Sequence, residues 1–426
     1  MAPRTFGDLI KTGLMGPVGK RLLRARASYA VARYLLNRAS GFDMESAKLM
    51  TRFAIDESEK AYTGKRLGVW TTAFFPTELV YAAGLTPFSP EVSSAVAASL
   101  GAASKFLSAA DAQWYSTDLC SFHRAAAGGL IEGFLPKPRA FLASHHLCDG
   151  GPFLFRNAAN VVGAPLYVVD VPPTAGPSDS EAVIYVASQL KEALALLEHV
   201  SNKRVTPEDL KATVRLSNEC RHFMVQVNEL RRRRPSPLTG VHAFSYIYLT
   251  FCGPGSKGAV DVYKALVRDI EHRIAVPDGE RYRLLWLHLR PYFPNTILHH
   301  LEKDLGAVVA FEELNEVYWE PLDEDRPLES LAAKMLSHPG YGPVERRIRA
   351  IIRMVERYHI DGVINFGNWG CRQSTGSAYM LKEALREEGI PYLVLDGDCI
   401  NGDNFSEGQA LTRIEGFLEM LSERAS

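Results

Sequence analysis

Short apolar runs alternate with longer segments of helical periodicity along this chain, and that alternation constrains the fold more than any other feature. The runs lie at 67–72, 140–143, 166–171, 284–289, 307–311, 362–366 and 392–395. Mainly apolar runs of this length are typical of parallel strands that are buried on both faces. Because strands that alternate with helices form parallel sheets covered by helices, the sequence predicts an α/β protein with two doubly wound, flavodoxin- or Rossmann-like sheet domains.

The segments around the two sets of runs define the predicted domain boundaries. We expect an N-terminal helical arm at 1–60, a first α/β domain at 61–200, a helical bridge at 201–257 and a second α/β domain at 258–426. Helices are predicted at 181–200, 344–358, 373–388 and 407–422. The main helix of the bridge is expected to begin at Thr206, because Pro207 and two acids follow this N-cap hydroxyl. Segment 239–252 fits either a helix or a strand.

The charge balance excludes some classes of protein. The formal net charge of the 426 residues is −1, which argues against a nucleic-acid-binding role for the whole molecule. No apolar run approaches the roughly 20 residues that a membrane-spanning helix needs. The apolar core and cleavage site of a secretory signal do not follow the N-terminus, so we expect a cytoplasmic protein.

The first 40 residues are an exception to this charge balance. They contain eight Lys and Arg residues but a single acid, Asp8. The basic residues are Arg4, Lys11, Lys20, Arg21, Arg24, Arg26, Arg33 and Arg38. We interpret the segment as a basic helical arm packed on the body or on a partner subunit. A transit peptide or a membrane-surface helix is the alternative, because both are rich in basic residues and poor in acids.

The cysteines are the residues most suited to carry chemistry. They are Cys120, Cys148, Cys220, Cys252, Cys371 and Cys399, and no two form a C-x-x-C pair, which weakens a structural zinc site. Cys148, Cys371 and Cys399 follow predicted strands by four or five residues, where α/β folds build their sites. Cys120 precedes a helix-like segment, whereas Cys220 lies on an apolar helix face as inert core cysteines do. These positions fit an iron–sulfur cluster or redox-active thiols, and spacing does not separate the two.

The local sequences around these cysteines resemble those of a known family. The segments are KRLGVWTTAFFPTELVYAAGLTPF at 65–88, STDLCSFHR at 116–124, HHLCDGG at 145–151, GVINFGNWGCRQSTG at 362–376 and LDGDCINGDNFSEGQ at 395–409. The last two closely resemble the C-terminal signature of the subunits of 2-hydroxyacyl-CoA dehydratases and benzoyl-CoA reductases. The first three resemble the opening strand–turn–helix and the two earlier cysteine segments of that family. The similarity covers about residues 60–422.

The resemblance implies a specific cofactor and reaction. Cys120, Cys148 and Cys371 would be the three protein ligands of a [4Fe–4S] cluster between the two α/β domains, and a non-protein ligand would complete the fourth iron. The substrate would be an acyl-CoA thioester that reacts through a ketyl radical in an oxygen-sensitive, anaerobic lyase or oxidoreductase. A separate ATP-hydrolysing iron–sulfur activator would supply the electron, and no G-x-x-x-x-G-K-S/T loop lies in this chain. Such subunits work with a paralogous chain or as a dimer.

Two alternatives remain within the same family. One branch carries a double-cubane [8Fe–9S] cluster and reduces small molecules. Cys220, Cys252 and Cys399 would have to converge to hold the second cubane, and Thr375 stands where many relatives have a further cysteine. The other alternative is a companion subunit whose cluster only relays electrons to a paralogous partner.

Residues next to the cysteine motifs are the remaining candidates. His146, beside Cys148, is a candidate for proton transfer, and Ser374 and Glu407 are candidate catalytic residues. Trp369, Arg372 and Gln373 flank Cys371 and are candidates for contact with the cluster or thioester. His123 and His145 are weaker candidates of the same kind, and Asp396 and Asp398 are candidates for supporting hydrogen bonds. The run 231–234 is expected to be a solvated basic helix end, with the phosphates of CoA as the alternative contact.

Overall fold

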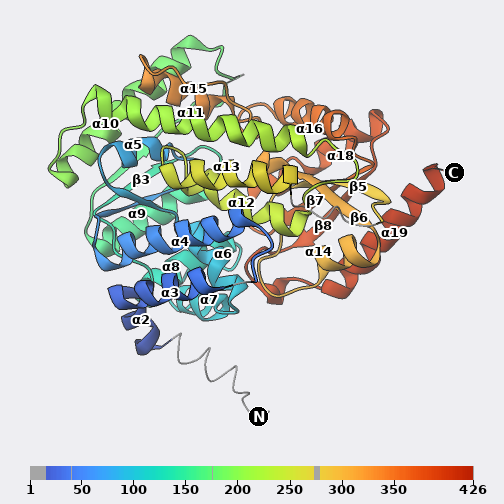
Figure 1. The fold of residues 1–426 in the computed structure, drawn as a ribbon, viewed down its shortest axis with the longest axis horizontal. Coiled ribbons are helices and arrows are strands. Elements are labelled where there is room, and N and C mark those ends of the chain that lie inside the picture. Colours follow the sequence, from blue (N-terminus) through green and yellow to red (C-terminus); the bar gives the residue numbers. More distant parts are fainter. Residues whose placement is uncertain (1–15, 40, 175, 273–278, 426) are drawn as a thin grey trace.

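The computed structural model describes residues 16–39, 41–174, 176–272 and 279–425 (Figure 1). The first sheet is parallel and has the order β2-β1-β3-β4, formed by β1 (Gly68–Thr71), β2 (Thr86–Phe88), β3 (Ala140–Ser144) and β4 (Leu166–Val169). The second is parallel with the order β6-β5-β7-β8, formed by β5 (Tyr282–Leu287), β6 (Ala307–Glu312), β7 (Gly362–Asn368) and β8 (Tyr392–Gly397). The predicted fold class is therefore confirmed.

The two sheets have the same topology. In each, the chain moves from its first strand to one neighbour, then returns and adds the last two strands on the other side. All strands stay parallel, but the side on which new strands are added changes between β1 and β3 in the first sheet and between β5 and β7 in the second. Doubly wound folds bind ligands at the carboxyl ends of the strands at this reversal. Cys148 follows β3 and Cys371 follows β7, so both lie at such positions.

Helices surround both sheets. Those before and within the first unit are α2 (Pro17–Arg24), α3 (Arg26–Arg38), α4 (Glu45–Thr63), α5 (Thr77–Ala82), α6 (Pro90–Ser99), α7 (Ala103–Asp111), α8 (Ser121–Ile131), α9 (Gly150–Val162) and α10 (Ser180–Ser201). Between the sheets lie α11 (Pro207–Leu230), α12 (Gly240–Cys252) and α13 (Lys257–His272). The second unit has α14 (Ile297–His299), α15 (Pro327–Ser337), α16 (Val344–Tyr358), α17 (Arg372–Thr375), α18 (Ala378–Glu387) and α19 (Glu407–Ala425). Figure 1 shows α11, α12 and α13 crossing from the first sheet to the second. The exact domain boundaries stay a prediction.

The expected start of the bridge helix is confirmed in detail. The Thr206 hydroxyl accepts a hydrogen bond from the Asp209 amide at 3.2 Å, and the Asp209 carboxylate accepts one from the Thr206 amide at 3.0 Å. This reciprocal pair is a capping box, which satisfies two amides that the helix start leaves free. Segment 239–252, which fitted either structure, is helix α12.

Two expectations about secondary structure were wrong or incomplete. Segment 373–388 was predicted as one helix, but α17 ends at Thr375 and α18 begins at Ala378. Strand β2 was not predicted, because it has three residues and contains Pro87, which cannot donate a ladder hydrogen bond.

The prediction of a fully solvated helix end at 231–234 was also wrong for its first residue. Arg231 is 1% exposed and donates two hydrogen bonds to the Glu312 carboxylate, at 2.8 and 2.9 Å. Its guanidinium also lies over the Phe311 ring. Because a buried guanidinium needs a paired acid, Arg231 joins the bridge to the second sheet and is not available to bind CoA.

The described part of the basic N-terminal arm packs on the body of the protein, which agrees with the interpretation of this segment as a packed helical arm. Helices α2 and α3 pack on α4, α4 contacts α13 of the bridge, and Arg24 of α2 donates to the Gly133 carbonyl of the first α/β unit at 2.8 Å. Arg4 and Lys11 lie outside the described residues. Within the residues that the structure describes, no helix combines the length and apolar character that crossing a membrane requires.

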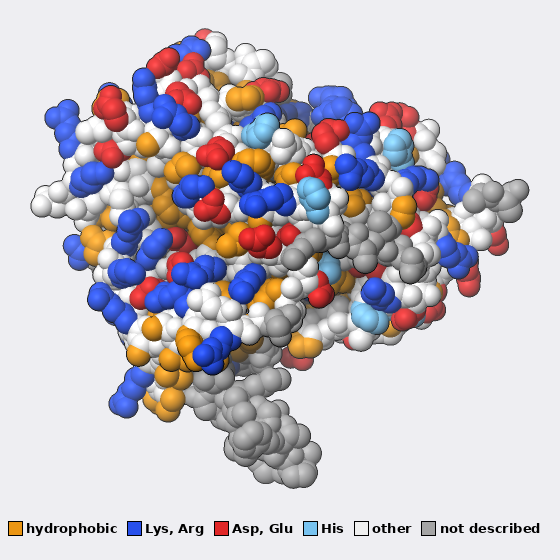
Figure 2. All heavy atoms as spheres, viewed as in Figure 1, with side chains coloured by type: hydrophobic (Ala, Val, Ile, Leu, Met, Phe, Trp, Pro, Cys, Tyr) orange, Lys and Arg blue, Asp and Glu red, His pale blue; other side chains and the backbone are white. Residues whose placement is uncertain are grey.

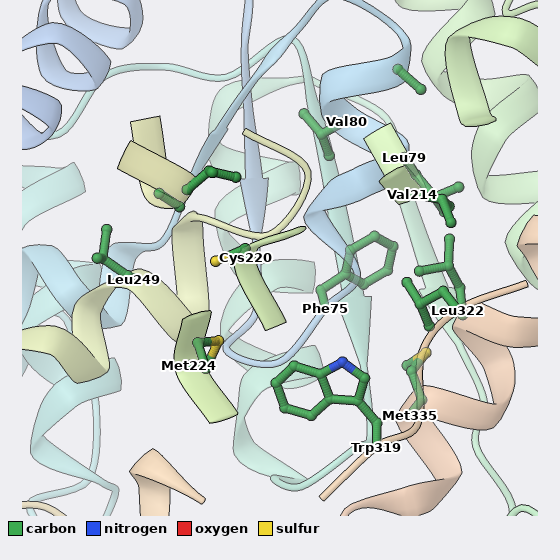
Figure 3. Packing of buried hydrophobic residues seen from close by; sticks show 14 of the residues in the cluster. Phe75, Leu79, Val80, Val214, Cys220, Met224, Leu249, Trp319, Leu322 and Met335 are labelled. Atoms are coloured by element: carbon green, nitrogen blue, oxygen red, sulfur yellow. The ribbon is translucent and has the colours of Figure 1, made fainter. Parts of the chain in front are cut away.

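Two large cores hold the molecule together. One joins the first sheet to α10, α11 and α13, and it contains Cys220 (Figure 3). The other contains Phe122 of α8 together with Ile364 and Phe366 of β7. Because this second core takes side chains from both α/β units, it fixes the carboxyl ends of the two sheets against each other.

Candidate functional site

Three cysteine loops meet where the two sheets face each other. Cys120 immediately precedes α8, Cys148 lies between β3 and α9, and Cys371 lies between β7 and α17. All three line one cavity of about 720 Å³. The fold therefore brings together the three cysteines that the resemblance implied as cluster ligands. They come from segments up to 251 residues apart (371 − 120).

Close packing of the loops positions these thiols. Gly370 has a φ of +70°, and a Cβ at this position would lie 2.5 Å from the Cys120 amide nitrogen, so only glycine fits here. Arg372 pairs with Asp149 at 3.0 Å, which ties the loop of Cys371 to that of Cys148.

Hydrogen bonds from the second sheet hold the loop of Cys120. The Ser121 hydroxyl donates to the buried Asp398 carboxylate at 2.5 Å, and Asp398 also accepts from the Ile400 amide at 2.8 Å. Asn368, the last residue of β7, has its Nδ2 3.9 Å from the Cys120 Sγ, and its Oδ1 accepts from the Cys399 amide at 2.7 Å. The predicted supporting role suits Asp398, whereas Asp396 is exposed and lies 3.5 Å from Arg413.

The three thiols share one electrostatic environment. Burial raises the pKa of Cys120 well above its usual value, and the neighbouring thiols of Cys371 and Cys148 raise it further. Burial likewise raises the pKa of Cys148 to about 12 and raises that of Cys371. Opposing this, backbone amides of the turn after each cysteine hydrogen-bond to its sulfur. Without a cation the thiols stay protonated, and a positive centre between them would favour the thiolates.

A buried ion pair supports the loop of Cys371. Arg347 binds the Glu313 carboxylate through two hydrogen bonds of 2.6 and 2.8 Å and donates to the Gln373 carbonyl at 3.1 Å. Glu313 also accepts from the amide of His288 at 3.2 Å. The His288 ring nitrogen Nε2 then lies 3.5 Å from the Cys371 Sγ. The pair thus links the ends of β5, β6 and β7 around one thiol.

We call the region around these cysteines the thiol end of the cavity. His123 lies 3.9 Å from Glu91 there, and burial raises the pKa of Glu91 to about 7. Burial lowers the pKa of His123 to about 4 and that of His146 to about 3, so both imidazoles are neutral at pH 7. The thiol end therefore combines thiols, neutral imidazoles and a carboxyl that titrates near neutrality, a combination typical of a catalytic site.

The opposite region, which we call the apolar end, is built by helices. Its walls include Met50, Ala54 and Tyr62 of α4, Val96 of α6 and the adjoining Leu100, Phe106 of α7, Phe134 after α8, and Phe244 and Tyr248 of α12. Glu57 of α4, which is 8% exposed, is an acid among these residues. Leu100 is 66% exposed and Val96 is 54% exposed, so solvent reaches this wall of the cavity at α6. This end suits a long, mainly apolar ligand segment.

The structure separates the other predicted site residues into two groups. His146 and Gln373 line the cavity. Ser374 is fully buried and accepts a hydrogen bond from the Asn368 amide at 3.0 Å, while Trp369 is 55% exposed and Arg372 points toward Asp149. Glu407 accepts hydrogen bonds of 2.6 Å from the Thr296 amide and hydroxyl at the start of α14.

The catalytic and binding roles of these six residues stay predictions, and their positions favour His146 and Gln373, which line the cavity. His146 is only 2% exposed, so it is a buried residue of the cavity wall.

Several residues of the site were missed in the sequence. Glu91, His288, Arg347 and Asn368 all line the cavity. Two of them carried a usable signal, because His288 follows β5 and Asn368 ends β7, where polar residues mark sites in this fold class.

The other three cysteines do not join a second group of thiols. Cys399 is fully buried behind Asn368, Cys252 ends α12, and Cys220 belongs to the separate core of Figure 3, packed near Met224 and Leu249. Across the described part of the chain, no three His, Cys, Asp or Glu side chains are placed to hold a single metal ion. This arrangement lends no support to the second cubane.

Fold and cavity together define a paired α/β protein whose two sheets share a cysteine-lined site. The model of the family described as 2-hydroxyglutaryl-CoA dehydratase, D-component, matches residues 72–421, and the chain belongs to this family. It is 24% identical over 376 residues to the (R)-phenyllactyl-CoA dehydratase alpha subunit of Clostridium sporogenes, with 84% of this chain and 90% of that protein covered. It is 25% identical to the (R)-2-hydroxyisocaproyl-CoA dehydratase alpha subunit of Clostridioides difficile, with 85% and 91% covered. One of the subunits of the benzoyl-CoA reductase of Thauera aromatica is 24% identical, with 73% and 78% covered. The resemblance seen in the sequence is confirmed.

Proposed function

We propose that this chain is a subunit of an acyl-CoA dehydratase or reductase, and that Cys120, Cys148 and Cys371 hold a [4Fe–4S] cluster at the thiol end. The observation that carries the proposal is the arrival of three thiols, from three separate loops and both α/β units, on the wall of one cavity. The names of the relatives, which are subunits of CoA-thioester dehydratases and of a reductase, support the same reaction class.

The donor set suits a cluster in three respects. Thiolates are the protein ligands of iron–sulfur clusters, and three of them leave one iron for another ligand. Backbone amides that hydrogen-bond to sulfur stabilise the negative charge of the ligands. The positive N-terminal ends of α8 and α9, which begin one and two residues after Cys120 and Cys148, add to this effect.

Within this proposal the chain's own residues bind and position the substrate and move its protons. A bound cluster would supply one low-potential electron to the thioester, with an ATP-hydrolysing activator as the source of that electron. Glu91 is the group best suited to accept a substrate proton, because a carboxyl with a pKa of about 7 is deprotonated in an appreciable fraction at neutral pH. The neutral imidazoles of His123 and His146 are hydrogen-bonding partners for it or for the thioester. The apolar walls exclude water from the reacting atoms.

The partner in this proposal is a second, related chain. The (R)-phenyllactyl-CoA dehydratase beta subunit of Clostridium sporogenes is 23% identical to this chain over 244 residues. Both an alpha and a beta subunit of that enzyme therefore resemble this sequence. A paralogous chain, or a second copy of this one, would complete the enzyme.

Iron and acid-labile sulfide should be measured on protein purified without oxygen. We expect about four irons per chain in the wild type. Cys371→Ser should lose most of this iron, whereas Cys220→Ser, which alters a core cysteine outside the cavity, should retain it. Full iron in Cys371→Ser, or an iron-free wild type, would refute the proposed ligand set.

A further inference from the structure

Three cations from two distant helices, α2 and α7, lie around Phe134 at the apolar end. Lys20 of α2 and Lys105 of α7 lie over the ring of Phe134, with their Nζ atoms 5.0 and 5.1 Å from its centroid. Arg24 donates to the Gly133 carbonyl at 2.8 Å, next to the same ring. Figure 2 shows Lys and Arg side chains gathered over the region of α2–α4, at the lower left of the view.

This cluster is rich in positive charge. Lys20 lies 3.9 Å and Lys105 lies 3.2 Å from one shared carboxylate, that of Glu132. The hydrogen bonds of Arg24 go to backbone carbonyls, and no described carboxylate forms an ion pair with it. Both lysines lie near the same carboxylate, and a third cation lies beside them. Such a patch attracts a ligand that carries several negative charges.

The cluster borders the opening of the cavity. Phe134, which the two lysines cover, lines the cavity, and so does Leu23, the neighbour of Arg24. Leu100, next to the start of α7, also lines it and is 66% exposed. A ligand that enters here passes the cations first, then the apolar end, and reaches the thiols last.

The apolar end contains one hydrogen-bond acceptor without a partner. Glu57 is 8% exposed and lines the cavity, and Lys60 donates to its Oε1 at 2.5 Å. Its Oε2 is buried and has no hydrogen-bond partner among the described residues. A buried carboxylate oxygen that lacks a donor is costly, so a ligand amide or hydroxyl placed there would be stabilised.

We propose that coenzyme A enters beside α6, with its phosphates on Lys20, Arg24 and Lys105 and its pantetheine arm along the apolar end. This inference rests on the proposed function, because it takes an acyl-CoA as the ligand. Multiple phosphates match the cations, a long chain with apolar and amide groups matches the walls and Glu57, and the thioester then arrives beside Cys120, Cys148 and Cys371.

The proposal also gives a role to the basic N-terminal arm. The family match begins at residue 72, so Lys20, Arg24 and Glu57 lie outside it. The arm is therefore a part of the CoA site that the family model does not describe. Its packing on α4 holds two of the cations against Phe134.

The first test varies the ligand and leaves the full chain unchanged. Binding of acetyl-CoA, acetyl-dephospho-CoA and S-acetylpantetheine, which lacks all phosphates, should be measured by calorimetry. We expect acetyl-CoA to bind at least about tenfold more tightly than S-acetylpantetheine, with the preference declining as salt is added. Equal binding of both would overturn the phosphate site and leave the proposed function standing. Absence of binding by both would instead refute the proposed function.

The second test removes the cations. A variant with Lys20→Gln, Arg24→Gln and Lys105→Gln should bind acetyl-CoA and S-acetylpantetheine with affinities within about twofold of each other. Its matched control is Lys203→Gln, Lys382→Gln and Arg386→Gln, which removes three exposed positive charges after α10 and on α18 and should keep the wild-type preference. If the cation variant also keeps that preference, the assignment is wrong. Lys105→Gln alone, on a separate helix, should lose part of the preference and guards against misfolding of the triple variant.

Discussion

The two ends of the cavity are built by different means. The thiol end consists of the loops that follow β1, β3, β5 and β7 together with the loop before α8, and it is held by the buried pairs Arg347–Glu313 and Ser121–Asp398. The apolar end consists of the sides of α4, α6 and α12 and is lined mainly by side chains without hydrogen-bonding groups. The strand ends thus provide chemistry and the added helices provide ligand binding, so substitutions at one end should leave the function of the other intact.

Glu91 lies at the thiol end, and its replacement should give the largest effect on turnover after loss of the cluster. Glu91→Gln removes the proposed proton acceptor, and kcat/KM should fall about 100-fold or more with iron content unchanged. Because the wild-type carboxyl has a pKa of about 7, wild-type activity should rise as pH increases through that value, and the variant should lack this limb. The measurement is a pH profile of kcat/KM beside an iron assay.

Stability separates this role from a structural one. Burial raises the pKa of Glu91 above its unfolded value, so the folded protein holds this proton more tightly and loses stability as pH rises from the unfolded pKa to about 7. Glu91→Gln should therefore be at least as stable as the wild type at pH 8. If Glu91→Gln keeps the wild-type activity and its kcat/KM still rises with pH through about 7, Glu91 is not the proton acceptor.

Ala54→Phe tests the apolar end by itself. Ala54 lines the cavity from α4, and a ring at this position should occupy space that the ligand needs. We expect the Kd of acetyl-CoA to rise about tenfold, with wild-type iron and sulfide content. Ala212→Phe, on the exposed side of α11, is the control and should bind normally. Loss of iron in Ala54→Phe would show that a change at the apolar end also affects the thiol end, contrary to the separation of roles.

Sequence patterns predicted the thiol end far better than the apolar end, for a physical reason. Cys148 and Cys371 follow recognisable buried strands, and topology carries the carboxyl ends of neighbouring strands to one edge. Glu91 looks like any acid in the first turn of a helix, and its pKa rises only because other elements bury it. Lys20 and Lys105 meet over Phe134 from positions 85 residues apart (105 − 20), which no local pattern reveals.

The same limit explains the errors in the fold. A run of four arginines is typical of a solvated surface, and Arg231 departs from this only because Glu312, on β6, faces it in the folded protein. The uniform apolar run at 239–252 is a helix because both the bridge and the second sheet pack against it. Tertiary contacts decided these cases, whereas the capping box at Thr206 is local and was read from the sequence.

Ser121→Ala should have the smallest effect, and it tests whether the thiol end depends on the contact between the two α/β units. The Ser121 hydroxyl, one residue after Cys120, donates to Asp398 across 277 residues of sequence. Alanine removes this bond and leaves Asp398 with its backbone donors Ile400 and Asn401, so we expect a loss of about 1–3 kcal/mol of unfolding free energy. Denaturant unfolding of the variant and of the control Ser188→Ala, which changes an exposed serine on α10, measures the difference.

The iron content of Ser121→Ala at low temperature should stay normal, because Asn368 and Gly370 still hold the loop of Cys120. On heating, the variant should lose its iron at a lower temperature than the wild type. If iron is lost at the wild-type temperature, the loop of Cys120 is held by the first α/β unit alone.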